Sequence, residues 1–182
     1  MLVPAPRYGQ HGGPGYRRIL EFLTAQAGPG SARRFAESVF FSWLVLNTDA
    51  HAKNYSIQIL PEQTTLSPLY DLSSLLPYIG PDDPDARRRD IAETRLALTL
   101  VDDYRVSALT RFEWEGAARD AAIPPAEFLE WGIELNRALP SAIDAAVDSI
   151  PAGIDPTIAT RLSDAIRSRS LEVGRILARR RA

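Results

Sequence analysis

The sequence predicts a mainly α-helical fold that carries one short β-hairpin. Apolar residues recur at helical spacing over most of the chain, whereas a single stretch, YSIQIL, alternates apolar and polar residues. Breaks rich in Gly and Pro separate these stretches. A chain of 182 residues is long enough for one hydrophobic core, so we expect residues 1–182 to form a single domain.

The first part of the chain predicts a lead-in and two helices. Residues 1–15 lack periodicity and are expected to be irregular, and a helix over 16–27 should direct inward Ile19, Leu20, Phe22 and Leu23. The GPGS sequence at 28–31 should end this helix, and Ser31 should cap the next one, over 32–47. In that helix, large apolar residues recur at helical spacing, as Phe35, Val39, Trp43 and Leu46. It is apolar on more than one face from Val39 onward, so we expect it at the centre.

The remaining elements follow in order. Residues 55–60 predict a strand, 61–65 a turn, and a second short strand should include Leu66. The charged stretch 81–90 predicts a surface loop. Helices are expected within 106–121, 125–150 and 156–182, punctuated by Pro124-Pro125, Pro140 and residues 151–153. On the last helix a solvated face is expected for Arg161, Arg167, Arg169 and Arg175.

Composition excludes several classes of protein. A net charge of −2 provides no basic field for general nucleic-acid binding. The absence of cysteine excludes disulfides and thiolate metal sites, and it fits a reducing compartment. The N-terminus has no apolar signal sequence, and no run of about 18 apolar residues predicts a membrane span. We therefore expect a cytoplasmic protein without a membrane partner.

Four polar residues whose side chains could take part in chemistry lie within the six positions 49–54. Asp49 precedes Asn54 by five residues, and Asp71 comes after the hairpin, which should return the chain to the vicinity of Asn54. An Asp, an Asn five positions later and a further Asp form the pattern by which protein kinases transfer phosphate. Oxygen atoms from an amide and a carboxylate suit Mg²⁺, and Asp49 could accept the proton of a substrate hydroxyl. Lys53 could neutralise phosphoryl charge, while His51 could contact phosphate or fix the loop.

Structural alternatives exist for two of these residues. Asp71 could cap a helix over 72–78 in addition to binding a metal. His51 could serve only as a hydrogen-bonded loop residue. Trp43 is interpreted as a core residue rather than a nucleotide-stacking one.

The two motifs resemble a known family. NTDAHAKNYSIQI followed by LSPLYDLSSLLPY is similar to the catalytic core of HipA-like serine/threonine kinases, the toxins of two-gene toxin–antitoxin modules. The family pattern is T-D-x-H-x-K-N-x-S, then L-x-P-x-Y-D. Every fixed position is present, as Thr48, Asp49, His51, Lys53, Asn54, Ser56, Leu66, Pro68, Tyr70 and Asp71. GGPGYRRILEFL, ETRLALTL and RVSALTRFEWEGAARDA also resemble family segments.

The resemblance implies a fold, an activity and roles for residues. The fold would be the mostly helical C-terminal lobe of a kinase-like protein, which transfers phosphate from ATP to a protein Ser or Thr. Asp49 corresponds to the catalytic base, and the Mg²⁺ ligands correspond to Asn54 and Asp71. The nucleotide site corresponds to His51, Lys53 and Tyr70. Implied partners are a protein substrate, such as an aminoacyl-tRNA synthetase or another translation component, and a DNA-binding antitoxin.

The family also has an N-terminal lobe that grasps ATP. Residues 1–45 contain nothing similar to that lobe, and HGGPGY does not follow a strand as a phosphate-binding loop would. We therefore expect the chain to be incomplete as an enzyme by itself, with the lobe supplied in cis or in trans. Two alternatives stay open. One is a small-molecule phosphotransferase of the aminoglycoside or choline kinase type, although Asn47 replaces the first His of that motif. The other is a non-catalytic module that binds an antitoxin.

Overall fold

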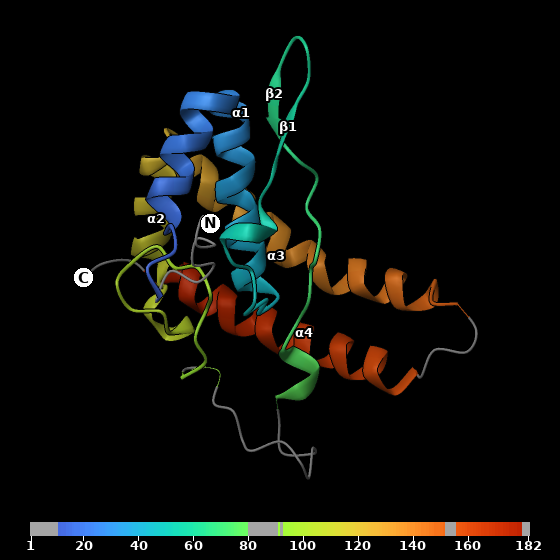
Figure 1. Cartoon of the computed structure of the whole chain (residues 1–182). Coiled ribbons are helices and arrows are strands. Elements are labelled where there is room, and N and C mark those ends of the chain that lie inside the picture. Colours follow the sequence, from blue (N-terminus) through green and yellow to red (C-terminus); the bar gives the residue numbers. More distant parts are fainter. Residues whose placement is uncertain (1–10, 80–90, 92, 152–155, 180–182) are drawn as a thin grey trace.

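The computed structural model describes residues 11–79, 91, 93–151 and 156–179. Its architecture is mainly helical with one two-stranded hairpin, as the sequence predicts (Figure 1). The helices are α1 (Tyr16–Leu44), α2 (Arg111–Asp120), α3 (Pro125–Asp148) and α4 (Pro156–Ala178). Among the described residues the strands are β1 (Ile57–Ile59) and β2 (Thr64–Leu66), and short 3-10 turns include η2 (Ala52–Asn54), η3 (Leu76–Tyr78) and η4 (Val106–Ala108). The charged stretch 81–90 lies outside the described residues.

Helix α1 joins the two helices that the sequence predicts through a kink at Gly28. The φ angle of Gly28 is 77°, in the left-handed region that glycine adopts without a steric penalty. The predicted cap at Ser31 is wrong, because residues 29–31 are already helical and Ser31 lies inside the helix. Its buried hydroxyl instead accepts a hydrogen bond from the backbone N–H of Leu66 at 3.1 Å. Ser31 therefore ties α1 to the hairpin.

In the first half of α1, fewer residues face the core than the sequence predicts. Leu20 and Leu23 are buried and Ile19 packs against the core, whereas Phe22 is 51% exposed. Successive residues turn by about 100° around a helix, so Phe22 lies roughly opposite Leu20. The prediction that Phe22 faces inward is wrong for that reason.

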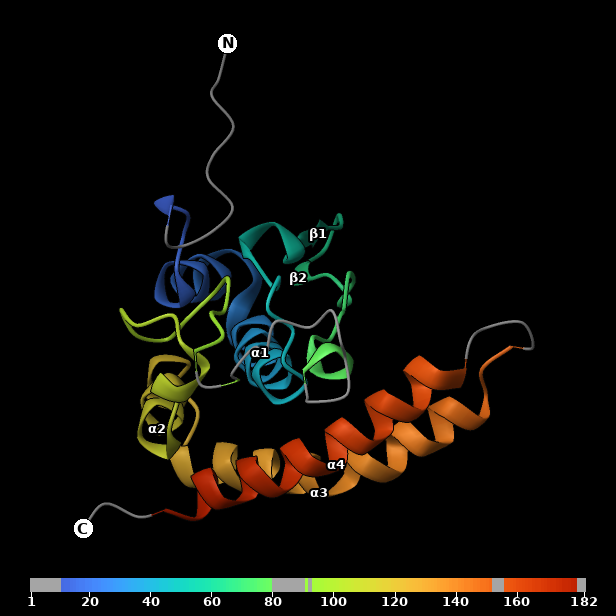
Figure 2. The same ribbon diagram turned by 90° about the horizontal axis from the view of Figure 1, so that it is seen from below.

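The second half of α1 is the centre of the molecule, as predicted. Phe40 is fully buried and its ring centroid lies 4.8–5.8 Å from those of four other aromatic residues, Trp43, Trp114, Phe128 and Trp131. These rings come from α1, α2 and α3. Figure 2 shows α3 and α4 side by side in a layer beneath α1 and α2. The aromatic cluster thus joins the layers of the fold.

The hairpin agrees with its prediction. Strand β1 pairs antiparallel with β2, with Ile57 opposite Leu66, and the turn is closed by hydrogen bonds between Leu60 and Gln63. Leu66 is buried against the core, and β2 packs on α1. The hairpin therefore leaves the loop after α1 and returns the chain to the same region.

Two predictions for the C-terminal helices require correction. Pro140 lies inside α3 and does not end it; its ring removes only one intrahelical donor, the one that would pair with the Asn136 carbonyl. Arg169 is not on a solvated face of α4, because it is 1% exposed. Arg167 and Arg175 are exposed, as expected.

None of the helices in the described part of the chain is long and apolar enough to cross a membrane.

Gly132 marks a close contact between α3 and α1, and it gives a testable prediction. A Cβ added there would lie 2.7 Å from Cζ of Phe40, whose ring is held by the aromatic cluster. Gly132→Ala should therefore destabilise the fold by about 1–3 kcal/mol through overpacking, less the roughly 1 kcal/mol that Ala gains in helix propensity. Urea unfolding followed by circular dichroism measures the net change.

A matched control is Gly116→Ala in α2. There the nearest atom to an added Cβ is the end of the Arg119 side chain at 4.0 Å, so the substitution is unhindered. Helix propensity alone should make this variant more stable, by up to about 1 kcal/mol. Equal stabilisation by both substitutions would contradict the close contact at Gly132.

Candidate functional site

The candidate site begins where the chain leaves α1. Leu46 is fully buried and has a φ angle of 55°, a left-handed conformation that bulky residues rarely adopt. The Leu75 N–H donates to the Leu46 carbonyl at 3.1 Å, which helps to hold the turn. Strained backbone of this kind persists only where the surrounding structure enforces it, and it is frequent at functional sites.

Segments from two other parts of the chain hold this loop. The Ser73 hydroxyl donates to Oδ1 of buried Asn47 at 3.0 Å, and the Ser74 hydroxyl donates to the Val45 carbonyl at 2.7 Å. On the other side, the Ala97 N–H donates to the Thr48 carbonyl at 3.1 Å. The loop geometry is therefore set by residues distant in sequence. Ser73 is not among the predicted site residues, and Asn47 is named from the sequence only as the residue in the place of a motif His. A polar residue that ends an apolar run such as WLVLN is a signal for a buried role.

The two proposed metal ligands lie side by side. Nδ2 of Asn54 donates to Oδ2 of Asp71 at 2.7 Å, while Oδ1 of Asn54 accepts the His51 N–H at 2.9 Å. Asp71 has a φ angle of 56°, which aspartate tolerates better than most residues. The predicted approach of Asn54 and Asp71 is thus observed. The alternative cap role for Asp71 is wrong, because η3 begins later and its N-cap position is Leu75.

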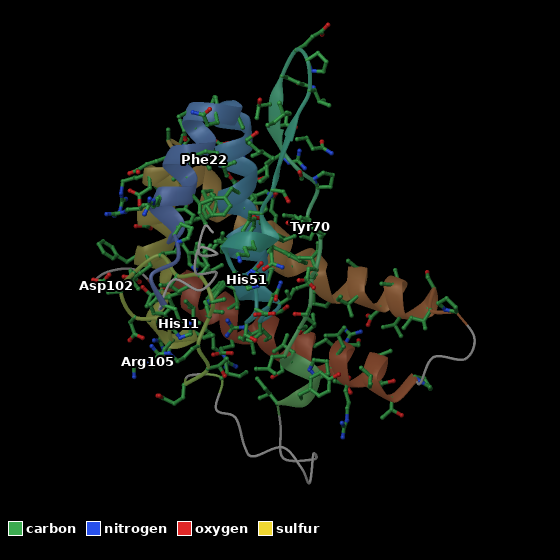
Figure 3. All side chains as sticks on the ribbon, in the orientation of Figure 1. His11, Phe22, His51, Tyr70, Asp102 and Arg105 are labelled. Carbon is green, nitrogen blue, oxygen red and sulfur yellow. The ribbon has the colours of Figure 1, made fainter. Side chains whose placement is uncertain are left out.

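Tyr70 fastens the Asp71 segment to the loop. Its hydroxyl donates to the Lys53 carbonyl at 2.8 Å and lies 2.6 Å from the hydroxyl of Ser56. Because a phenol has one O–H, the Ser56 hydroxyl is the donor in the second bond. Figure 3 shows Tyr70 on the segment that follows the hairpin, close to the turn that holds His51. The hydroxyl of Tyr70 thus fixes the residue before Asp71, while the side chain stays 44% exposed.

The other predicted site residues differ in burial. Asp49 and Lys53 are exposed, whereas His51 and Asn54 are buried. The loop that holds Asn54 therefore also presents a carboxylate and an ammonium group to solvent. A base that receives a proton from a bound hydroxyl must be accessible in this way.

The residue after Asn54 anchors the loop to the core. The ring of Tyr55 meets that of Phe35 edge-on, with centroids 4.8 Å apart. Burial raises the pKa of Tyr55, and hydrogen bonds with Ser42 and Ser38 oppose that shift. Tyr55 therefore remains a neutral phenol, and its contact with Phe35 anchors the residue next to Asn54.

The oxygen atoms at this site fit a hard divalent cation. Asp71 provides a carboxylate, and the Asn54 carbonyl has a second lone pair beyond the one that accepts the His51 N–H. Within the part of the chain that the structure describes, no group of three or more His, Cys, Asp or Glu is arranged around a metal position. A cation would therefore take few ligands from the protein. This is typical of Mg²⁺ that shares a phosphate substrate and keeps several waters.

Comparison with known proteins identifies the family. The family model described as the HipA-like C-terminal domain matches residues 2–143. Two proteins of Sinorhizobium fredii (strain NBRC 101917 / NGR234) are similar. The one named "Putative kinase Y4mE" is 24% identical over 159 residues, 86% of this chain and 33% of its own length. The one named "Putative kinase Y4dM" is 40% identical over 73 residues, 39% of this chain and 18% of its own.

A solved structure shares the fold. It is described as the Shewanella oneidensis MR-1 toxin–antitoxin system HipA, HipB and its operator DNA complex, and it matches with a TM-score of 0.73 at 19% identity. The match covers 93% of this chain and 39% of that one, so this chain spans well under half of the proteins that it resembles. Because the family model covers most of the sequence, the chain belongs to the family of HipA-like C-terminal domains.

Proposed function

We propose that this chain is the catalytic C-terminal lobe of a HipA-like serine/threonine protein kinase. Its reaction is the transfer of the γ-phosphate of ATP to a protein Ser or Thr hydroxyl. The observation that carries the proposal is the 2.7 Å contact between Asn54 and Asp71, which lie 17 residues apart in the chain and flank the hairpin. Asp49 lies on the same loop as Asn54, which supports a site shared by a base and two oxygen ligands.

The residues take the following roles in this proposal. Asp49 accepts the proton of the attacking hydroxyl. Asn54 and Asp71 hold Mg²⁺, which when bound offsets the negative charge of the transferring phosphoryl group. Lys53, His51 and Tyr70 belong to the nucleotide site in this proposal, with Lys53 and Tyr70 exposed and His51 buried in the loop. The hydroxyl of Tyr70 keeps Asp71 beside Asn54 through its bond to the Lys53 carbonyl.

Further partners complete the proposed enzyme. An N-terminal lobe, in cis or in trans, supplies the phosphate-binding loop; the chain's coverage of only 33% of one kinase relative supports this. The similar Shewanella structure contains an antitoxin and operator DNA, which supports a DNA-binding antitoxin as a partner here. We propose a translation component, such as an aminoacyl-tRNA synthetase, as the protein substrate, and the cytoplasm as the location.

Radiolabelled ATP tests the reaction. The chain, joined to or mixed with the N-terminal lobe, should transfer label from the γ position to protein in the presence of Mg²⁺. Phosphoamino-acid analysis should then recover phosphoserine or phosphothreonine. Labelling of an aminoglycoside or choline in place of protein would favour the small-molecule alternative. Antitoxin binding without transfer to any acceptor would favour the non-catalytic module.

Metal binding can be tested separately with Asp71→Asn. Asparagine also tolerates the left-handed backbone at this position, so the fold should be unchanged while the negative charge is lost. We expect the affinity for Mn²⁺, used as a paramagnetic substitute for Mg²⁺, to fall by about 10-fold or more. Water-proton relaxation during Mn²⁺ titration of the chain measures it.

Asp148→Asn is the control for this prediction, because Asp148 is an exposed carboxylate at the far end of α3. It removes the same charge and should leave Mn²⁺ affinity unchanged. Equal affinities in the parent chain and both variants would mean that Asp71 does not bind the cation.

A further inference from the structure

A buried arginine from α4 reaches the end of α1. The side chain of Arg169 is 1% exposed, and its guanidinium carbon lies 5.0 Å from the centre of the Trp43 ring. Nη2 donates to the Trp43 carbonyl at 3.3 Å, and Nη1 forms an ion pair with Glu172 at 2.8 Å. Nε has no hydrogen-bond partner among the described residues. The Trp43 ring and carbonyl are therefore both contacted by one side chain that is 126 residues away in sequence.

This contact lies at the end of α1, where the loop at 46–54 begins. Trp43 is in the last turn of α1, three residues before the strained turn at Leu46. The last carbonyls of a helix lack intrahelical donors and carry partial negative charge, so a guanidinium is a favourable partner there. The Leu46 N–H donates to the same Trp43 carbonyl at 3.3 Å. Arg169 thus shares its acceptor with the first residue of the turn.

Helix α4 also supports the other half of the site. It packs against η3, which follows Asp71 by a few residues, as well as against α1. The loop at 46–54 and the segment at 71–78 are joined by the bond from Leu75 to Leu46. One helix thus contacts both the end of α1, from which the loop at 46–54 begins, and η3, in the segment that follows Asp71. The family model ends at residue 143, so α4 lies beyond the matched segment.

The ion pair with Glu172 is not a sufficient reason for a buried charge in this position. Burial lowers the pKa of Arg169, which Glu172 opposes, and Glu172 itself is 45% exposed. Taking a charge out of water costs free energy that such a pair does not fully return, and apolar residues of similar size often serve as well or better. What an apolar residue cannot supply is the hydrogen bond to the Trp43 carbonyl.

We propose that Arg169 is a positioning residue, which fixes the end of α1 through the Trp43 carbonyl and thereby holds the loop at 46–54 in its working conformation. Its importance for phosphate transfer depends on the proposed function; its effect on loop order does not. Loss of the Arg169 side chain should increase local opening of the loop at 46–54 and of the joined 71–78 segment. Local opening of α2 and α3 should not change.

Hydrogen exchange of the 182-residue chain tests this proposal. Three amides report on the loop: Asn47, which donates back to Ser42 at the end of α1, and Leu75 and Ala97, which donate to the loop carbonyls of Leu46 and Thr48. In Arg169→Met these amides should exchange about 10-fold faster, because losing one hydrogen bond favours local opening. Amides within α2 and α3 should exchange at the parent rate. Arg167→Met is the matched control, since Arg167 is exposed on the same helix. It should change none of these rates.

Unchanged exchange at Asn47 and Leu75 in Arg169→Met would overturn the proposal. An equal rise throughout α2 and α3 would also overturn it, because Arg169 would then support the whole core. If Arg169→Met does not fold, Arg169→Lys decides, since it keeps the charge but lacks the guanidinium fork. Faster exchange confined to the loop supports the proposal, and parent-like exchange rejects it. With the assembled kinase, kcat should fall in Arg169→Met and recover in part in Arg169→Lys.

Discussion

Asp49→Ala should abolish nearly all phosphate transfer by the assembled kinase. A positioned general base contributes on the order of 10²–10⁴-fold to the rate, so kcat should fall by that factor. The KM for ATP should be unchanged, because the proposed metal ligands, Asn54 and Asp71, are intact. Asp49 is exposed, so the free energy of unfolding should change by no more than about 0.5 kcal/mol. Initial rates measured with labelled ATP, with urea unfolding beside them, check both expectations.

The control for Asp49 is Glu62→Ala. Glu62 is an exposed carboxylate in the hairpin turn, outside the proposed site, so its removal should leave turnover at the parent level. Parent-like turnover in Asp49→Ala would assign Asp49 a structural role. A fall in stability that matches the fall in turnover would lead to the same assignment.

Among the substitutions proposed here, Trp114→Ala should lower the free energy of unfolding the most. Trp114 is fully buried, and its ring centroid lies 4.8 Å from that of Phe40 and 5.2 Å from that of Trp43. Its indole nitrogen has no hydrogen-bond partner among the described residues, so the cost arises from lost apolar contacts and from the cavity. Such truncations cost about 3–5 kcal/mol. Since domains are stable by roughly 5–15 kcal/mol, the urea transition should shift far toward low denaturant or disappear.

Phe22→Ala is the matched control for this loss, because Phe22 is an aromatic residue that is 51% exposed on α1. Its truncation should change the free energy of unfolding by about 0.5 kcal/mol or less. If Trp114→Ala costs as little as Phe22→Ala, the aromatic cluster does not carry the core. Thermal unfolding of the three proteins in parallel is an independent check.

Local patterns determined the elements of this protein. Helical spacing in 32–47 and 125–150 indicated α1 and α3, and alternation in 55–60 indicated the hairpin, because side-chain direction repeats with a period fixed by the backbone. The same patterns identified the crowded loop at 49–54 and placed Asp71 after a hairpin that must bring the chain back. That geometry follows from antiparallel pairing alone, and the contact of Asn54 with Asp71 agrees with it.

Only the tertiary structure decided which polar residues are buried and what they bond. Ser31 looked like a helix cap, but β2, 35 residues away, gives its hydroxyl a different partner. Arg169 was expected on a solvated arginine face, but it lies about 200° around α4 from exposed Arg167. The end of α1 covers Arg169 and supplies a carbonyl. A sequence shows the period of an element, whereas the environment of each face depends on elements that fold against it from elsewhere in the chain. The contact of α4 with the end of α1 and with η3 is for this reason a property of the packed molecule.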